Sequence, residues 1–350
     1  MAERAFRHVT PEEFRWHTEL SGDPDSLCEL LWIDGHLDDG WQIGIGLMRA
    51  RPLMDGHPAI FIRLLSPDGR CIQADEKFTH EEFQNGGGLS ARWGRNNSIV
   101  ADVGPSGSPG AYRLSLRVRE FEVDLHCVAE CTGVKFVTAS PGYTACDTKS
   151  GLATGWWPLI PRARVSGSIV VQGEARQVSG LFYLERQVSS LPLGGREGEK
   201  TAQSIWAWGN FHAGDFTAGW TDSGASEDFG YRHFTPFVMW KGSDPFLSTF
   251  SFASYVEKFA INPKNGLAYP EVVTLKASGG DIDFFARLVS GHIIDHYEMN
   301  NKRDSLYCRQ ASEVHAQIRQ WGATRRIEGR AVHEWGTRAG NFPFIRNEPR

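Results

Sequence analysis

The sequence lacks the features that mark membrane, secreted or nucleic-acid-binding proteins. Its 350 residues contain no run of about 18 apolar residues, so we expect no stable membrane insertion. The first residues, MAERAFRHVTPEEF, lack the apolar segment of a signal peptide, which favours a cytoplasmic location. With 37 basic and 42 acidic side chains, the net charge of −5 offers no basic surface for nucleic acid.

Motifs for cofactors and metals are also missing. There is no P-loop, no GxSxG, no GxGxxG after a strand and no HExxH, so nothing favours a nucleotide, a flavin or a catalytic zinc ion. The six cysteines are scattered, and without an export signal we expect free thiols. His126, Cys127 and Cys131 form no partnered zinc spacing, so we expect no metal. Any chemistry should therefore use side chains alone, with no cofactor.

Glycine and aromatic residues are plentiful, with 38 glycines and 12% aromatic residues. Most of the chain alternates apolar and polar residues with period two, which predicts strands. In AYRLSLRVREFEVDL the apolar phase flips at Arg119-Glu120, which indicates a turn. Further hairpins are expected around residues 172–174 and at Gly279-Gly280. These signals predict an all-β protein.

Two short helices have recognisable starts. Thr10 and Glu13 form a capping-box pattern, and Thr79 and Glu82 repeat it before a glycine run that begins at Gly86.

The length exceeds what one all-β core usually holds, so we expect two domains. The most loop-like run is 190–200, SLPLGGREGEK, which suits an interdomain linker or a long loop over a site. We place the boundary here, giving an N-terminal domain of residues 1–195 and a C-terminal domain of residues 196–350.

The stretch SIWAWGNFHAGDFTAGW, residues 204–220, is the strongest candidate for a functional site. As a strand, it places Trp206, Trp208, Asn210 and His212 on one face. That face suits the wall of an apolar cavity with a few polar groups. It also suits a core with a satisfied histidine, followed by a turn at Gly214-Asp215.

A second candidate ends the preceding predicted strand, in YLERQV. Alternation places Arg186 on one face and Glu185 on the other. A surface ion pair is one interpretation; an acid and a cation at the mouth of the same cavity is the other.

Three segments resemble the carotenoid hydratase family (hydroxyneurosporene synthase) and its AttH-type relatives, which fungal decalin-forming Diels–Alderases also resemble. ELLWIDGHLDDG, residues 29–40, is similar to the family's opening acidic-aromatic segment. Residues 156–188 resemble its central hairpin, and WAWGNFHAGDFT, residues 206–217, resembles the aromatic strand that follows. The resemblance implies two tandem lipocalin-like antiparallel β-barrel domains, a hydrophobic polyene or terpenoid substrate, and no organic cofactor.

The departures from the family alter the expected chemistry. Where the hydratases have Asp-His-x-Trp, this chain has Glu185, Arg186, Gln187 and Val188, so the family's acid/base histidine is absent. Trp32 stands where the family has a tyrosine, and Asp215 matches the family aspartate. Arginine stays protonated near neutral pH, so it cannot act as a base but can polarise a carbonyl.

The resulting hypothesis is a cofactor-independent cyclase or lyase for a hydrophobic natural-product intermediate. Burial among tryptophans would raise the pKa of the catalytic acid or base Asp215, His212 would carry a second proton, and Glu185 would orient Arg186. The expected substrate-binding residues are Trp32, Tyr183, Trp206, Trp208, Asn210, Phe216 and Tyr231. A hydratase or dehydratase and a non-catalytic lipocalin-like carrier remain as alternatives, and the sequence does not indicate the oligomeric state.

Other polar clusters have structural interpretations. The group Asp34, Asp38 and Asp39 is expected to serve hairpin geometry. The group His292, Asp295 and His296 is expected at a polar strand end or turn, and residues 333–335 on a closing strand.

Overall fold

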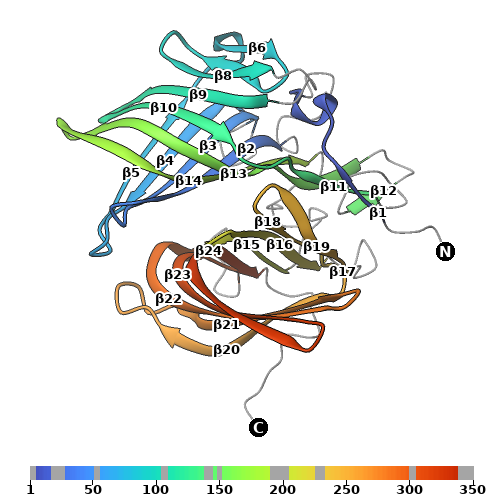
Figure 1. The fold of residues 1–350 in the computed structure, drawn as a ribbon. Coiled ribbons are helices and arrows are strands. Elements are labelled where there is room, and N and C mark those ends of the chain that lie inside the picture. Colours follow the sequence, from blue (N-terminus) through green and yellow to red (C-terminus); the bar gives the residue numbers. More distant parts are fainter. Residues whose placement is uncertain are drawn as a thin grey trace. The chain divides into compact units, whose positions relative to one another are not determined.

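A computed structural model describes residues 5–16, 28–50, 56–103, 109–137, 145–147, 152–189, 205–224, 233–298 and 305–337 (Figure 1). These residues form antiparallel strands and two short 3-10 helices, which confirms the all-β prediction. Within these ranges, no helix is long and apolar enough to cross a membrane.

The chain divides into two compact units. Unit 1 holds Met1–Pro192 together with Gly242–Asp244, and unit 2 holds Leu193–Lys241 and Pro245–Arg350. The expected linker, 190–200, lies outside the described residues, so the boundary between 195 and 196 stays a prediction.

Unit 1 is built on a 12-stranded antiparallel sheet in the order β5-β4-β3-β2-β14-β13-β10-β9-β8-β7-β6, with β12 pairing β13. A small second sheet pairs β1 with β11. The strands are β1 (Ala5–His8), β2 (Cys28–Leu37), β3 (Gln42–Ala50), β4 (Ala59–Leu65), β5 (Cys71–Lys77), β6 (Phe83–Gly87), β7 (Ser90–Trp93), β8 (Asn97–Val103), β9 (Pro109–Val118), β10 (Phe121–Ala129), β11 (Val134–Val137), β12 (Ala145–Asp147), β13 (Leu152–Val171) and β14 (Glu174–Ser189). The 3-10 helices are η1 (Pro11–Phe14) and η3 (His80–Glu82).

The sheet of unit 1 curls round one apolar core, as the strong bend of its ribbons shows (Figure 1). Trp93 of β7 donates from Nε1 to the carbonyl oxygen of Met48 in β3, 2.7 Å away, although the two strands are not neighbours in the sheet. The alternating residues from 112 to 125 all join this core, as predicted. A curled sheet leaves a second face outside the core, and the candidate site of unit 1 uses that face.

Unit 2 is a 10-stranded antiparallel sheet in the order β19-β18-β16-β15-β24-β23-β22-β21-β20, with β17 pairing β16. Its strands are β15 (Ile205–Ala213), β16 (Phe216–Gly224), β17 (His233–Phe234), β18 (Phe237–Lys241), β19 (Asp244–Thr249), β20 (Phe252–Ile261), β21 (Ala268–Gly279), β22 (Ile282–Glu298), β23 (Leu306–Gln320) and β24 (Ala323–Thr337).

The sheet of unit 2 also curls round its own core, which is rich in phenylalanine. The Phe284 ring stacks on Phe211 with centroids 5.9 Å apart and lies tilted against Phe237 with centroids 4.9 Å apart. Asp222 of β16 accepts hydrogen bonds from the backbone N–H and hydroxyl of Ser254 in β20, at 2.9 and 2.8 Å. These bonds join two strands that are far apart in the sheet order and hold its curvature.

Most local expectations hold. The turns fall at Arg119-Glu120 and Gln172-Gly173, and the third lies at Gly280-Asp281, one residue beyond the expected tip. Both capping boxes are present on short 3-10 helices. The second helix was expected to continue to Gly86, but β6 begins at Phe83 and pairs with β7.

Two glycines of β13 and its hairpin test how closely the strands approach. Gly167 has φ +147°, and a Cβ there would lie 2.1 Å from the carbonyl oxygen of Asp124, whereas Gly173 has φ +83° and open space. We predict that Gly173→Ala costs about 1 kcal/mol of unfolding free energy, because only backbone strain is added. Gly167→Ala should cost at least about twice as much, because β10 must also move. Urea unfolding of the two variants checks this, and equal losses would contradict the close approach.

Candidate functional site

The face of β14 that points away from the core of unit 1 holds a buried carboxylate, Glu185. Its side chain is fully buried. Oε2 accepts hydrogen bonds from Trp156 Nε1 and from Tyr183 Oη, the latter at 2.9 Å, and Oε1 accepts one from Gln187 Nε2 at 3.2 Å. Three donors on one carboxylate stabilise its ionised form.

The neighbouring strand β2 extends this group. Register pairs Glu185 with Trp32 and Tyr183 with Asp34, so all four side chains share one face. Trp32 Nε1 donates to Asp34 Oδ1 at 3.1 Å. Asp34 is only 1% exposed and lies inside a strand, so the expected turn role is wrong for this residue. We call Trp32, Asp34, Trp156, Tyr183, Glu185 and Gln187 the β14 cluster.

The phenol of Tyr183 is held in its protonated form. Burial is the main cause that raises the pKa of Tyr183 well above its ordinary value, and the negative charges of Glu185 and Asp34 raise it further. A neutral phenol bonded to a carboxylate is a donor–acceptor pair that can move a proton in a water-poor environment. The β14 cluster therefore has the parts of an acid–base site.

The Arg186 side chain points to the opposite face of β14, towards the core of unit 1. Its Nη1 donates to Glu29 Oε1 at 2.6 Å, its Nη2 donates to the carbonyl oxygen of Phe14 at 3.0 Å, and its guanidinium lies 4.9 Å from the Trp16 ring centroid. Burial lowers the pKa of Arg186 to about 10, with Glu29 opposing the shift, so the cation persists at neutral pH.

These positions correct both sequence interpretations of Glu185 and Arg186. Both side chains are fully buried, so they form no surface ion pair. They also do not flank one cavity mouth, because adjacent residues of a strand point to opposite faces. Glu29, rather than Glu185, orients Arg186, with Arg49 Nε on the other oxygen of Glu29.

In unit 2, the face of β15 opposite the core carries the predicted residues Trp206, Trp208, Asn210 and His212. Phe211 and Ala213 join the core, so the alternation is as expected. Asn210 and His212 are buried, and His212 Nδ1 lies 2.8 Å from Thr217 Oγ1.

Strands β23 and β24 place an ion pair beside these tryptophans. Arg309 lies 5.3 Å from the Trp208 ring centroid and pairs with Glu334, which also accepts from Tyr307 Oη at 2.6 Å. Glu334 therefore contributes to a charged group beside Trp208, rather than only to a closing strand.

The expectation for Asp215 is wrong in its physical basis. Asp215 lies in the β15–β16 turn, its side chain is 44% exposed, and it pairs with Arg325 Nη2 at 2.8 Å. Burial among tryptophans, which was to raise its pKa, is not found. Phe216 is a core residue, and Tyr231 lies outside the described residues. Neither Asp215 nor Phe216 therefore belongs to the candidate acid–base site.

On its core side, unit 2 also buries a polar group. Gln310 and Ser312 of β23 and His333 of β24 are 0%, 3% and 3% exposed, and Ser312 Oγ lies 2.9 Å from His333 Nε2. Burial, with a smaller contribution from the positive charge of Arg309, lowers the pKa of His333 to about 4, so its ring is neutral at pH 7.

The cysteines and histidines considered as metal ligands in the sequence do not form a metal site in the described residues. Burial raises the pKa of Cys127 and of Cys131 to about 12. His292, Asp295 and His296 lie towards the end of β22, which stops at Glu298, so the strand-end alternative holds and the turn does not. Across the parts of the chain that the structure covers, no three His, Cys, Asp or Glu side chains group as metal ligands.

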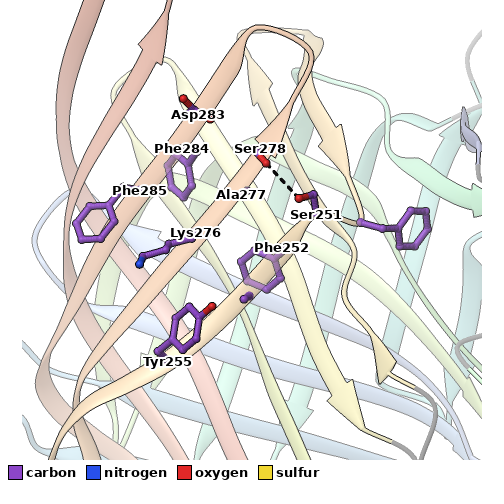
Figure 2. Close-up of a pocket in the computed structure, with 11 residues that line it drawn as sticks. Ser251, Phe252, Tyr255, Lys276, Ala277, Ser278, Asp283, Phe284 and Phe285 are labelled. Carbon is purple, nitrogen blue, oxygen red and sulfur yellow. Dashed lines mark hydrogen bonds between the residues drawn. The ribbon is translucent and has the colours of Figure 1, made fainter.

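An open hollow of about 430 Å³ lies on unit 2, over β20, β21 and β22. Figure 2 shows Tyr255, Lys276 and Phe285 beside one another on these strands, with Ser251 bonded to Ser278. Lys276 Nζ lies 5.4 Å from the Tyr255 ring centroid. The hollow has no buried acid or base, so we do not regard it as a catalytic site.

Several of these residues were missed from the sequence. Arg309 and Tyr307 had no signal of their own, since each depends on a partner across a strand. Glu29 begins the acidic-aromatic segment that resembles the family, but nothing in one sequence connects it to Arg186. Trp156 lay inside the resembling hairpin, but nothing in one sequence connects it to Glu185, 29 residues later.

Proteins of known structure share this fold along almost the whole chain. A putative AttH from Nitrosomonas europaea has a TM-score of 0.60 at 14% identity, covering 94% of this chain and 98% of that one. CghA has a TM-score of 0.62 at 9% identity, covering 95% and 98%. Kievitone hydratase from Nectria haematococca has a TM-score of 0.59 at 14% identity, covering 94% of this chain and 93% of that one. No protein-family model and no curated protein matches the sequence.

At these identities the similarity shows the fold alone. The protein is all-β, with curled antiparallel sheets in the lipocalin-like arrangement of the AttH and CghA structures. The structural neighbours agree with the AttH-type part of the resemblance, whereas membership of the carotenoid hydratase family has no support from sequence comparison.

We predict that Arg186 stabilises the fold. Arg186→Met should lower the unfolding free energy of unit 1 by about 3–5 kcal/mol, because it removes the buried cation paired with Glu29. Arg325→Met, which removes an exposed pair, should cost less than about 1 kcal/mol. Urea unfolding of both variants measures the difference, and a small loss for Arg186→Met would contradict a structural role.

Acid should destabilise unit 2 through His333. A histidine whose folded pKa is about 4 binds its proton more readily when unfolded, so stability is lost as pH falls through 6.5 towards 4. Between pH 7.5 and pH 5 the loss from this group is about 2 kcal/mol. His333→Gln should lose less stability over that range than the wild type, whereas the exposed His315→Gln should follow the wild-type curve. Parallel curves for all three would refute the assignment.

Proposed function

We propose that this protein is a cofactor-independent lyase or cyclase that moves a proton on a hydrophobic, unsaturated small molecule. The single observation behind the proposal is the Glu185–Tyr183 pair: a fully buried carboxylate with three donors, one of them a phenol. The substrate class, a polyene or terpenoid intermediate, follows from the family resemblance and from the aromatic surroundings.

The aromatic side chains of the β14 cluster suit an apolar substrate. Trp156 stacks on Phe136 with centroids 5.4 Å apart, which fixes the indole against Glu185. Trp32 and Gln187 are the partly exposed members of the cluster, so a substrate would make contact at this side, where Trp32 supplies the aromatic ring. Indole faces also stabilise positive charge that develops on an unsaturated chain.

The pair supports a balanced acid–base step. Glu185 takes a proton from a substrate carbon while Tyr183 delivers its phenolic proton to a departing hydroxyl group, which leaves as water. The proton on Glu185 then passes to the Tyr183 phenolate across their 2.9 Å hydrogen bond, restoring both groups. If Tyr183 protonates a double bond and Glu185 removes a proton after ring closure, the same pair performs a cyclisation.

The similar structures are compatible with this chemistry at the level of fold. One is named a hydratase, and hydration is the reverse of water elimination, while CghA was solved with Sch210972. Hydration therefore stays as the alternative reaction at the same pair, with water-derived oxygen in the product as its signature.

The test uses the compound that accumulates when the gene is deleted. Purified protein should convert it, and Glu185→Gln and Tyr183→Phe should each lower kcat/KM at least 100-fold, mainly through kcat, because proton transfer is worth about 10²–10⁴ in rate. Glu122→Gln, an exposed change in the same unit, should keep the wild-type rate.

Two results would overturn the proposal. Saturable binding of the compound without conversion would identify a carrier. Conversion at the wild-type rate by both Glu185→Gln and Tyr183→Phe would show that the chemistry lies elsewhere.

A further inference from the structure

The core side of unit 2 carries a polar layer directly beside its apolar core. Register pairs Gln310 with His333 and Ser312 with Ala331, and alternation puts all four side chains on the face that Ala331 presents to the core. The layer is therefore interior to unit 2 and distinct from the β14 cluster of unit 1.

Gln310 is the unusual member of this layer. It is fully buried, and neither its amide nitrogen nor its amide oxygen has a hydrogen-bond partner among the described residues. The Cys308 thiol interacts with the Gln310 side chain, but a thiol is a weak partner. An unpaired buried amide is costly, so its presence calls for a polar occupant such as a ligand group or water.

The next position of β24 on the same face is Trp335, which is aromatic and partly exposed. Cys308 pairs with Trp335 across β23 and β24, and Phe259 meets Trp335 edge-to-face with centroids 5.5 Å apart. Phe259 is 48% exposed and Trp335 half-buried. The polar layer thus lies between an apolar core and an accessible aromatic pair, the composition expected of a small-molecule site.

We propose that the interior of unit 2 is a second binding site, in which Gln310 recognises an uncharged, mainly apolar molecule through a primary amide or lactam group. A carboxamide presents a donor and an acceptor side by side, and an amide or lactam offers the complementary pair. His333 is neutral at pH 7 and is fixed by Ser312, so the layer offers no charge to attract an anion. Trp335 and Phe259 contact the apolar part.

The proposal is tested with benzamide and acetophenone, which differ by an amino group in place of a methyl group. Titration of the full-length protein, followed by tryptophan fluorescence and saturation-transfer NMR, should show benzamide binding at least tenfold more tightly than acetophenone. Gln310→Met should weaken benzamide binding at least tenfold and leave acetophenone unchanged. Gln317→Met, an exposed change on the same strand, should bind both as the wild type does.

Stability supplies an independent readout. Because Gln310→Met removes an unpaired buried amide, its urea midpoint should rise, so lost benzamide binding cannot be attributed to unfolding. Glu185→Gln should still bind benzamide, which separates this site from the proposed catalytic pair.

Three outcomes would overturn the inference. The first is no benzamide binding to the wild type, which would leave only water on Gln310. The second is equal binding of benzamide and acetophenone, and the third is unchanged benzamide binding by Gln310→Met.

Discussion

The pleat of β14 is the constraint on which the account of unit 1 depends. Neighbouring residues of a strand point to opposite faces, so Glu185 and Arg186 cannot serve one site. Arg186 points to the core side, where its Nη atoms donate to Glu29 and to the carbonyl oxygen of Phe14 and its guanidinium lies beside Trp16. Glu185 points to the other face, where a phenol, an indole and an amide surround it. A single strand thus places the cation paired with Glu29 and the carboxylate that we propose as the acid–base group on opposite faces.

This separation explains why the two charges have different consequences. A buried ion pair contributes little net stability, but removal of one partner leaves the other charge buried and unpaired, which strongly destabilises the fold. Stability of unit 1 therefore needs Arg186 and Glu29 together. Glu185 accepts hydrogen bonds from an indole, a phenol and an amide, and the dipoles of these groups offset its charge. A carboxylate that is hydrogen-bonded to a neutral phenol can exchange a proton with it, which is the property that an acid–base site needs.

Local patterns predicted the strands well, because period-two alternation and turn chemistry depend on neighbours in sequence. The phase flip at Arg119-Glu120 and the opposite faces of Glu185 and Arg186 were both readable in this way. The side-chain partners of these residues could not be predicted from the sequence. Glu29 meets Arg186 across 157 residues, and Arg325 meets Asp215 across 110, so neither the burial of Arg186 nor the exposure of Asp215 follows from composition. The predicted burial of Asp215 was wrong because the aromatic residues near it in sequence do not cover it in the fold.

The acid–base proposal requires that Tyr183 is a neutral phenol hydrogen-bonded to an ionised Glu185. NMR of protein labelled with 13C at the tyrosine ζ position, with Tyr183 assigned from Tyr183→Phe, measures this directly. In the wild type, the Tyr183 signal should stay that of a protonated phenol well above the ordinary tyrosine pKa, and Glu185→Gln should bring its titration back towards the ordinary value. A Tyr183 signal that titrates at the ordinary value in the wild type and does not change in Glu185→Gln would contradict this arrangement of charge.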